Sequence, residues 1–490
     1  MNVSLLFPEG AARPESLPAF SRDMLREDLK LNLVLDAVAA GDRDIRDAWD
    51  QAVFAPLQDK ALIEYRHEVL KDAETNTDAF WTLYEMCQEA DRRHKGSLTT
   101  VNWMSNYDLM ATFHGAVADL TAYIQTLRAL RKLAEQYGGS FRSRGFLSLF
   151  RMLREELSEA YLEDVKRQLA ELSSLDAFVV SVRLGSYLQG VDYVLQRREK
   201  KLLDLALAGA GTYKLGERDD PARDIGARQA RAVNELVNAL GRSAVYLAGF
   251  FDTLRSELAF YGGCLIFSEG MRSRGMPVCM PTITDAGTDS RAWEELYDVS
   301  LVVLKRAAVT GNDLRSSHKR LYLITGANQG GKTTFLRSLG LAQLMAQCGM
   351  PVGAASFAAP LRGAVYAHFK REEDRWMNSG KLDEELVRMR KITDFIRPGD
   401  LLLLNESFSS TSEREGSEML RQVTQALLDS GVEIFSVSHL HTYAAAFLGR
   451  EEVQFLRAQR LESGKRTFRI QTGEPLETAY GEDLYREVFG

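Results

Sequence analysis

A glycine-rich loop between an apolar strand and a helix constrains the fold of this 490-residue chain more than any other feature. The run Leu321-Tyr-Leu-Ile324 predicts a buried strand, and the loop Gly326-Ala-Asn-Gln-Gly-Gly-Lys-Thr333 leads from it into a helical pattern. After this helix, short apolar runs alternate with helical patterns as far as Val437. Such alternation is typical of an α/β domain with a largely parallel sheet, which is the fold that we expect for the last part of the chain.

The composition of the loop indicates a phosphate-binding site. Backbone N–H groups of a glycine-rich turn can point at one ligand, and the positive end of the following helix favours an anion. In such loops the lysine reaches the β- and γ-phosphates of a nucleotide and the next hydroxyl holds Mg²⁺. We therefore expect ATP and Mg²⁺ as cofactors, bound by Gly326, Ala327, Asn328, Gln329, Gly330, Gly331, Lys332, Thr333 and Thr334.

Two further segments carry candidate catalytic residues. Four leucines before Asn405 predict a central strand that delivers Asn405 and Glu406 to its carboxyl end. We expect Glu406 to polarise the attacking water, and His439, after the strand at 433–438, to contact the γ-phosphate with Lys332. Asn405 stands where a carboxylate is expected; an amide attracts Mg²⁺ less, so it is an indirect metal ligand at most.

The first half of the chain has a different pattern. Apolar residues recur every three or four positions from about residue 21 to residue 262, which predicts mostly helix. A heptad pattern from Val233 to Tyr261 predicts one long helix, packed either in its own bundle or against another molecule. Residues 178–195 are rich in β-branched and aromatic side chains, so we expect a small β element there.

The remaining composition limits location and partners. Apolar runs are too short to span a membrane, and four scattered cysteines suggest a reducing compartment, so we expect a soluble, cytoplasmic protein. The net charge of −7 restricts nucleic-acid binding to local basic patches. The candidate patch is Arg197, Arg198, Lys200 and Lys201, although these residues could also be a solvated helix face balanced by Glu199.

Residues 324–337 resemble the ATPase motif of the MutS family of DNA mismatch repair proteins, including Asn328 and the double glycine. Residues 405–416 resemble the family's second motif, and Val437-Ser438-His439 resembles its histidine segment. The resemblance implies an ABC-like P-loop ATPase domain at 264–490, hydrolysing ATP to ADP and phosphate. It also implies a helical core and lever region at 1–263, with a clamp-like arm at about 140–215.

The resemblance implies a composite site as well. Two ATPase domains pair, with Ser379 and Glu384 supplied to the partner's nucleotide, although Ser379 or Asp383 could simply cap a helix. Asn312 corresponds to a residue near the adenine, but the usual preceding aromatic is absent. We expect a homodimer, with ATP as a candidate trigger, that binds DNA by its shape and phosphates. The early start of the helical pattern leaves no room for the family's N-terminal mismatch-recognition domain.

Two alternatives remain at this stage. The chain could be a nucleotide-gated protein-interaction scaffold with weak or no hydrolysis and no direct DNA contact, which the acidic net charge favours. Asn405 and the segment Phe408-Ser409-Ser410, which replaces a glycine-rich loop of the family, would fit an inactive nucleotide-binding scaffold. The retained Lys332, Thr333 and Glu406 favour hydrolysis.

Overall fold

The computed structural model describes residues 1–100, 109–173, 179–184, 190–196, 220–285, 287–288, 290–371, 380–461 and 466–475. The chain forms two compact units. The first comprises Met1–Val3, Asn76–Arg142 and Phe146–Arg255, and the second comprises Ser4–Thr75, Ser143–Gly145 and Ser256–Gly490. The domain boundary that we expect from the sequence, between residues 263 and 264, remains a prediction.

The first unit is mainly helical, as its periodicity predicts. Its helices are α5 (Thr77–Thr100), α6 (Leu109–Tyr137), α7 (Arg144–Glu155), α8 (Glu159–Ser173) and the first part of α10 (Asp220–Arg272). The heptad positions Leu247, Phe251 and Leu254 of α10 are buried, and Phe251 stacks on Tyr123 of α6 with ring centroids 5.2 Å apart. The predicted β element is an antiparallel pair, β1 (Val179–Leu184) and β2 (Gly190–Gln196).

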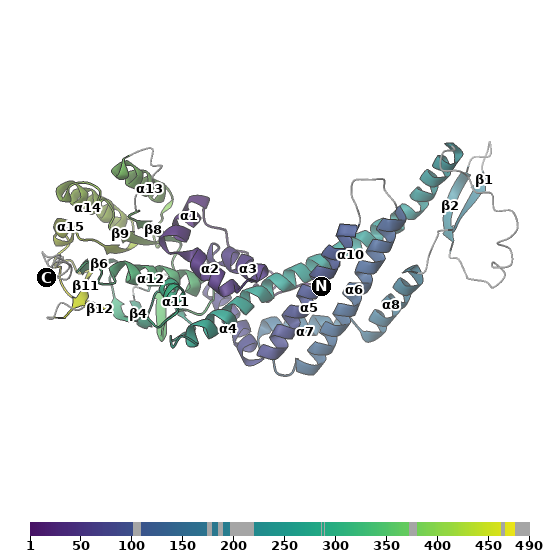
Figure 1. Ribbon diagram of the computed structural model, residues 1–490, viewed down its shortest axis with the longest axis horizontal. Helices are drawn as coiled ribbons and strands as arrows, with labels where there is room; N and C mark the ends of the chain where they lie inside the picture. Colours follow the sequence, from purple (N-terminus) through teal and green to yellow (C-terminus); the bar gives the residue numbers. More distant parts are fainter. Residues whose placement is uncertain are drawn as a thin grey trace. The chain divides into compact units, whose positions relative to one another are not determined.

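The second unit joins N-terminal helices to two mixed sheets (Figure 1). The helices are α1 (Ala19–Asp28), α2 (Leu31–Ala39), α3 (Arg43–Val53), α4 (Lys60–Thr75), α11 (Val299–Lys305), α12 (Lys332–Gln347), α13 (Lys381–Phe395), α14 (Glu413–Asp429) and α15 (His441–Ala445). The strands are β3 (Thr282–Thr284), β4 (Ser290–Leu296), β5 (Asn312–Ser317), β6 (Leu321–Gly326), β7 (Ser356–Pro360), β8 (Val365–Phe369), β9 (Leu401–Asn405), β10 (Glu433–Val437), β11 (Val453–Arg460) and β12 (Arg466–Thr472).

The larger sheet has six strands in the order β12-β11-β6-β10-β9-β8. All neighbours are parallel except β11 and β12, so the expected, largely parallel sheet is confirmed, with β12 as an antiparallel strand at one edge. Val437 of β10 lies opposite both Ile324 of β6 and Asn405 of β9. The three strands that carry the predicted motifs, β6, β9 and β10, therefore have their carboxyl ends side by side.

Helices and the smaller sheet cover the two faces of this larger sheet. One face packs on α1, α13, α14 and α15 in a continuous apolar cluster that includes Met24, Leu402, Leu420 and Tyr443. Helix α12 contacts β9 and β10, and it also contacts β3 and β4 of the four-stranded sheet β3-β7-β4-β5. The first helix after the glycine-rich loop is thus buried between two sheets.

Helix α1 closes the β8 edge of the larger sheet. The Asp28 carboxylate accepts a hydrogen bond of 3.2 Å from the Phe369 N–H and pairs with Arg388 of α13 at 3.1 Å. Arg388 donates in turn to the Phe369 carbonyl at 2.8 Å. An edge strand covered in this way cannot pair with another chain along its free side. Among the described residues, no helix is long and apolar enough to cross a membrane.

Candidate functional site

The glycine-rich loop connects β6 to α12, as the sequence predicts, and its backbone depends on glycine. Gly326 has φ +106° and Gly331, the N-cap of α12, has φ +92°. Side chains rarely adopt these values, and a Cβ on Gly326 would lie 3.0 Å from the Ala458 nitrogen. Gln329 also has positive φ, +58°. Any larger residue at Gly326 or Gly331 would deform the loop.

Lys332 is the first residue of α12 and folds back over the loop. Its Nζ donates hydrogen bonds to the carbonyls of Gly326 (2.7 Å) and Ala327 (3.0 Å). Burial lowers the pKa of the Lys332 ammonium; the Glu406 carboxylate opposes this shift and the Arg466 guanidinium adds to it. The lysine is thus a buried cation whose position is fixed by its own loop.

Thr333 and Asn405 lie side by side, although 72 residues separate them. The Thr333 hydroxyl donates a 2.9 Å hydrogen bond to the Asn405 side-chain oxygen at the end of β9. Both groups present neutral oxygens, and the described residues contain no group of three acidic, histidine or cysteine side chains that could hold a metal ion alone. Mg²⁺ commonly binds few protein groups and completes its shell with phosphate oxygens and water. These residues therefore fit a Mg²⁺ ion that arrives with a nucleotide.

Glu406 directly follows β9, and at this residue the backbone leaves the direction of the strand. Its φ is +53°, a left-handed conformation that is strained for a side chain of this kind. Its N–H donates a 2.9 Å hydrogen bond to the Val437 carbonyl, so the sheet holds the turn in place. This geometry brings Glu406 into the wall of the same cavity as Lys332 and Thr333.

The cavity has a volume of about 550 Å³. Its wall combines the loop with residues from α11, the segment before β5, β12 and the turn after β9. The lining residues are Leu301, Lys305, Ala308, Val309, Thr310, Asn312, Asn328, Gln329, Gly330, Gly331, Lys332, Thr333, Thr334, Glu406 and Phe468. The space and its polar floor suit a mononucleotide.

Asn312 lies in the cavity wall, where its resemblance-based role requires it. The side chain is buried, and its oxygen accepts a 2.7 Å hydrogen bond from the Ile470 N–H of β12. The contact fixes β12 against β5. Asn312 therefore shapes the cavity by positioning the strand that carries Phe468.

Phe468 is a site residue that sequence reasoning missed. The ring is 51% exposed and lines the cavity, and the Phe468 Cα would lie 3.5 Å from a Cβ at Gly331. Strand β12 bulges here: Arg460 pairs with Arg466 and Ala458 with Ile470, so one residue of β11 faces three of β12. The aromatic that usually precedes Asn312 in the family is absent here, and Phe468 is an aromatic residue in the wall of the same cavity.

His439 lies just beyond the β10 end, at the sheet edge that carries the loop and Asn405. Its side chain is exposed, and among the described residues it is not part of the cavity wall. The neighbouring Ser438 is fixed, because its N–H donates a 3.2 Å hydrogen bond to the Ile324 carbonyl. The backbone therefore places His439 near the site, while a γ-phosphate contact remains a prediction.

Comparison with known proteins agrees with this arrangement. Residues 58–274 match the family model described as MutS2 N-terminal domain, and residues 322–476 match the model described as MutS domain V. The chain is a MutS-related protein. The second match contains the loop, Asn405, Glu406, His439 and Phe468.

Individual relatives of this MutS-related chain match over shorter stretches. It is 31% identical to Endonuclease MutS2 of Thermus thermophilus over 194 residues. The matched stretch covers 39% of this chain and 26% of that protein. It is 28% identical over 163 residues to DNA mismatch repair protein MutS of Shouchella clausii, 33% of this chain and 19% of that protein. The chain thus matches about a quarter or less of the length of these two curated relatives.

The structure describes only part of the segment that we predict to face a partner molecule. Ser379 lies outside the described residues, and Glu384 lies in the first turn of α13, 3.7 Å from Arg371. The N-cap position of α13 is occupied by Gly380, and Asp383 lies in the first turn of the helix, while the capping alternative for Ser379 stays a prediction. Glycine serves at this position because it has no side chain to restrict the turn.

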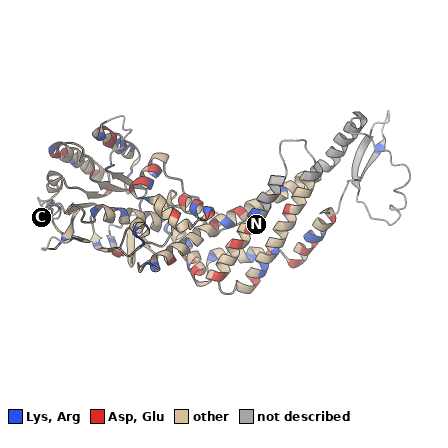
Figure 2. Ribbon diagram, viewed as in Figure 1, with Lys and Arg blue, Asp and Glu red and all other residues tan. Residues whose placement is uncertain are grey.

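The predicted DNA-binding residues Arg197, Arg198, Lys200 and Lys201 also lie outside the described residues. Over the described part of the chain, acidic and basic residues alternate along the helices of both units (Figure 2). Such mixing is typical of a solvated surface. The DNA contacts therefore remain a prediction.

The segment after Glu406, which departs from the family pattern, is held by buried polar side chains. His368 Nδ1 lies 2.7 Å from the Ser407 hydroxyl, and the Glu385 carboxylate accepts hydrogen bonds from the Phe408 N–H and, at 2.6 Å, from the Ser410 hydroxyl. Burial lowers the pKa of His368 to about 4, so its ring is neutral at pH 7. Phe408 itself is fully buried, which explains why an apolar residue fits there.

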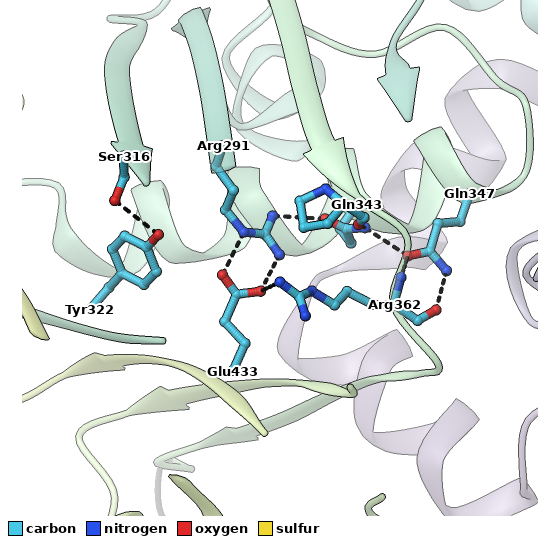
Figure 3. Close-up of polar contacts among 8 residues, drawn as sticks. Arg291, Ser316, Tyr322, Gln343, Gln347, Arg362 and Glu433 are labelled. Carbon is cyan, nitrogen blue, oxygen red and sulfur yellow. Dashed lines mark hydrogen bonds and ion pairs between the residues drawn. The ribbon is translucent and has the colours of Figure 1, made fainter. Parts of the chain in front are cut away.

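A buried ion network holds α12 between the two sheets (Figure 3). Arg291 of β4 forms a two-point pair with Glu433 of β10, and Arg362 reaches the same carboxylate at 2.7 Å. The Arg291 guanidinium also donates a 2.9 Å hydrogen bond to Gln343 of α12. Arg291 and Glu433 side chains are only 1% and 2% exposed. The hydrogen bond to Gln343 thus fixes the C-terminal half of α12, the helix whose first residue is Lys332.

Proposed function

We propose that this chain binds ATP in the cavity above the glycine-rich loop and hydrolyses it to ADP and phosphate. The observation that carries the proposal is that Lys332, Thr333 and Glu406 line one cavity, and that Thr333 is hydrogen-bonded to Asn405. A structural loop would need glycines, but it would not need a buried cation, two paired oxygen ligands and a strained carboxylate around the same space.

Each residue has a distinct role in the proposed reaction. Lys332 binds the β- and γ-phosphates and offsets the charge that develops during transfer. Glu406 orients the attacking water through its carboxylate and takes up its proton. Thr333 would hold Mg²⁺ directly and Asn405 indirectly, and the ion would neutralise phosphate charge when bound. Phe468 packs against the adenine, and His439 approaches the γ-phosphate from the neighbouring strand end.

The proposal extends to a dimer and to DNA, and here the support is the relationship to the MutS family. Glu384 is partly exposed on the first turn of α13, where a partner molecule can reach it. Hydrolysis in such a composite site depends on dimer formation. The chain clamps DNA without reading base sequence, so its binding weakens steeply with salt.

One observation favours the second candidate, a nucleotide-gated protein-interaction scaffold. Asn405 gives the predicted metal site an amide in place of a carboxylate, and slower hydrolysis would favour a long-lived ATP-bound state. In this candidate ATP closes the dimer around a protein partner, and DNA does not bind.

The two candidates are separated by ATP and DNA binding measured together. Fluorescent ATP should bind the wild-type chain with Mg²⁺, and Lys332→Ala should weaken this binding strongly. Lys319→Ala, which removes a half-buried lysine just before β6, should not. Duplex, branched and single-stranded DNA are then titrated at low salt with and without ATP. ATP-dependent DNA binding supports the clamp. ATP binding without any DNA binding supports the scaffold, and no ATP binding contradicts both.

A further inference from the structure

Arg466 opens β12 and lies beside the glycine-rich loop. Its Nη1 donates a 3.3 Å hydrogen bond to the side-chain oxygen of Gln329, which belongs to both the loop and the cavity wall. Its Nε and Nη2 atoms are buried and have no hydrogen-bond acceptor in the part of the chain that the structure describes. A buried guanidinium N–H without an acceptor is costly, so these two donors indicate a ligand.

The two unpartnered atoms have the right geometry for an oxyanion. Nε and Nη2 form one edge of the planar guanidinium, and their N–H bonds are nearly parallel. That edge can donate to two oxygens of one phosphate group, which is the arrangement that makes arginine suited to phosphate. The Gln329 contact uses Nη1, so the Nε and Nη2 edge makes no hydrogen bond within the part of the chain that the structure describes.

The surrounding charges also favour an anion. In the described part of the chain, the charged residues of the cavity wall are Lys305, Lys332 and Glu406. Arg466 adds another cation close enough to the Lys332 ammonium to affect its protonation. Like charges gathered around one cavity repel each other unless a negative ligand separates them. A polyphosphate supplies that charge.

The β12 bulge places Arg466 and Phe468 over different parts of the loop. Phe468 packs over Gly331, at the start of α12, and Arg466 reaches Gln329 within the loop. One short strand therefore places an aromatic ring in the cavity wall and a guanidinium beside Gln329, a loop residue that lines the same cavity. The ring suits a base and the guanidinium suits the phosphate chain.

We propose that Arg466 donates hydrogen bonds to the phosphates of the nucleotide bound by its own chain and so makes the site selective for di- and triphosphates. This inference rests on the proposed ATP site. It adds a phosphate ligand outside the glycine-rich loop, at the start of strand β12.

The test compares Arg466→Ala with Arg469→Ala. Arg469 lies on the same strand, and its guanidinium pairs with Asp313 at 3.5 Å. Affinities for ATP, ADP and adenosine are measured by competition with a fluorescent nucleotide. Arg466→Ala should weaken ATP and ADP roughly 10- to 100-fold, the range of charge-assisted hydrogen bonds, and change adenosine less than about threefold. Arg466→Lys should restore part of the loss, and Arg469→Ala should bind like the wild type.

Gln329→Ala distinguishes a phosphate ligand from a loop brace. If Arg466 acts only through Gln329, the two single variants and the double variant share one affinity. Unchanged ATP and ADP affinities in Arg466→Ala, or an equal loss for adenosine, would overturn the inference while leaving the ATP site intact. Failure of the wild-type chain to bind any nucleotide would instead overturn the proposed function. Melting temperatures of the variants show whether each one is folded.

Discussion

The Thr333 hydroxyl and the Asn405 amide oxygen lie 2.9 Å apart and join the first turn of α12 to the end of β9. Because the two oxygen atoms lie within hydrogen-bond distance, the end of β9 and the start of α12 together mark the position that we propose for a metal ion. The pair offers oxygen atoms without charge. In the proposed Mg²⁺ site, metal affinity should therefore depend on the nucleotide more than on the protein.

Asn405→Asp should strengthen Mg²⁺ binding in the presence of ATP. A carboxylate at this position adds a negative charge beside Thr333 and should lower the Mg²⁺ concentration for half-maximal ATP turnover roughly tenfold. The measurement is a Mg²⁺ titration of phosphate release. Asn405→Ala, which removes the oxygen, should shift the titration in the opposite direction; equal curves for all three proteins would exclude Asn405 from the metal site.

Phe468→Ala should weaken ATP and ADP about tenfold, because stacking of a base on an aromatic ring contributes about 1–3 kcal/mol. Phe468→Tyr should retain most of the affinity, since the ring remains. Unlike the Arg466 variant, Phe468→Ala should weaken adenosine to the same extent. Competition binding tests this contrast, and an adenosine affinity that is insensitive to Phe468 would contradict the assignment.

The strand ends could be predicted from the sequence because the information is local. Apolar runs such as 401–404 identify the strands, and parallel pairing brings Gly326, Asn405 and Val437 to one edge. Phe468 and Arg466 could not be predicted in the same way. Their position depends on the β12 bulge and on its bond to Asn312, 158 residues away, and no local pattern encodes such a contact.

The N-terminal helix illustrates the same limit. Its apolar spacing predicts a helix, but Asp28 meets Arg388 across 360 residues. Nothing in residues 19–28 indicates that they close an edge of the sheet. The contact arises from packing of the whole unit, and only the folded chain reveals it.

Glu433→Gln should destabilise the second unit by roughly 3–5 kcal/mol, because it leaves the Arg291 and Arg362 guanidinium groups buried without a counter-charge. Denaturant-induced unfolding measures the loss. Glu418→Gln is the matched control, since its pair with Arg421 is solvent-exposed and should therefore contribute much less to the free energy of unfolding. Similar losses from both substitutions would contradict the role of the network in anchoring α12.

His368 should make stability depend on pH. Burial lowers its pKa from 6.5 to about 4, so the unfolded chain takes up a proton before the folded chain does. The stabilising effect of the neutral ring is complete above pH 6.5 and is lost as the pH falls toward 4, with a maximum of roughly 3 kcal/mol.

Denaturation of wild type and His368→Gln at pH 7 and pH 4.5 isolates this contribution from other groups. Asp28 contributes with the opposite sign, because burial raises its pKa to about 6 and its protonation stabilises the folded chain as the pH falls. Both proteins retain Asp28, so the difference between them reports His368. The difference in free energy of unfolding between wild type and His368→Gln should be smaller at pH 4.5 than at pH 7. A difference that is constant with pH would show that the buried ring does not titrate in this range.

The most direct test of the central claim is ATP turnover by the wild-type chain and by Glu406→Gln. Hydrolysis by this site requires the carboxylate, while binding uses the loop, so phosphate release should fall by at least about 100-fold in Glu406→Gln and ATP affinity should remain within about threefold. Single-turnover release and equilibrium ATP binding give the two quantities. Equal turnover in both proteins would contradict the assignment of Glu406 and, with it, the proposed catalytic site.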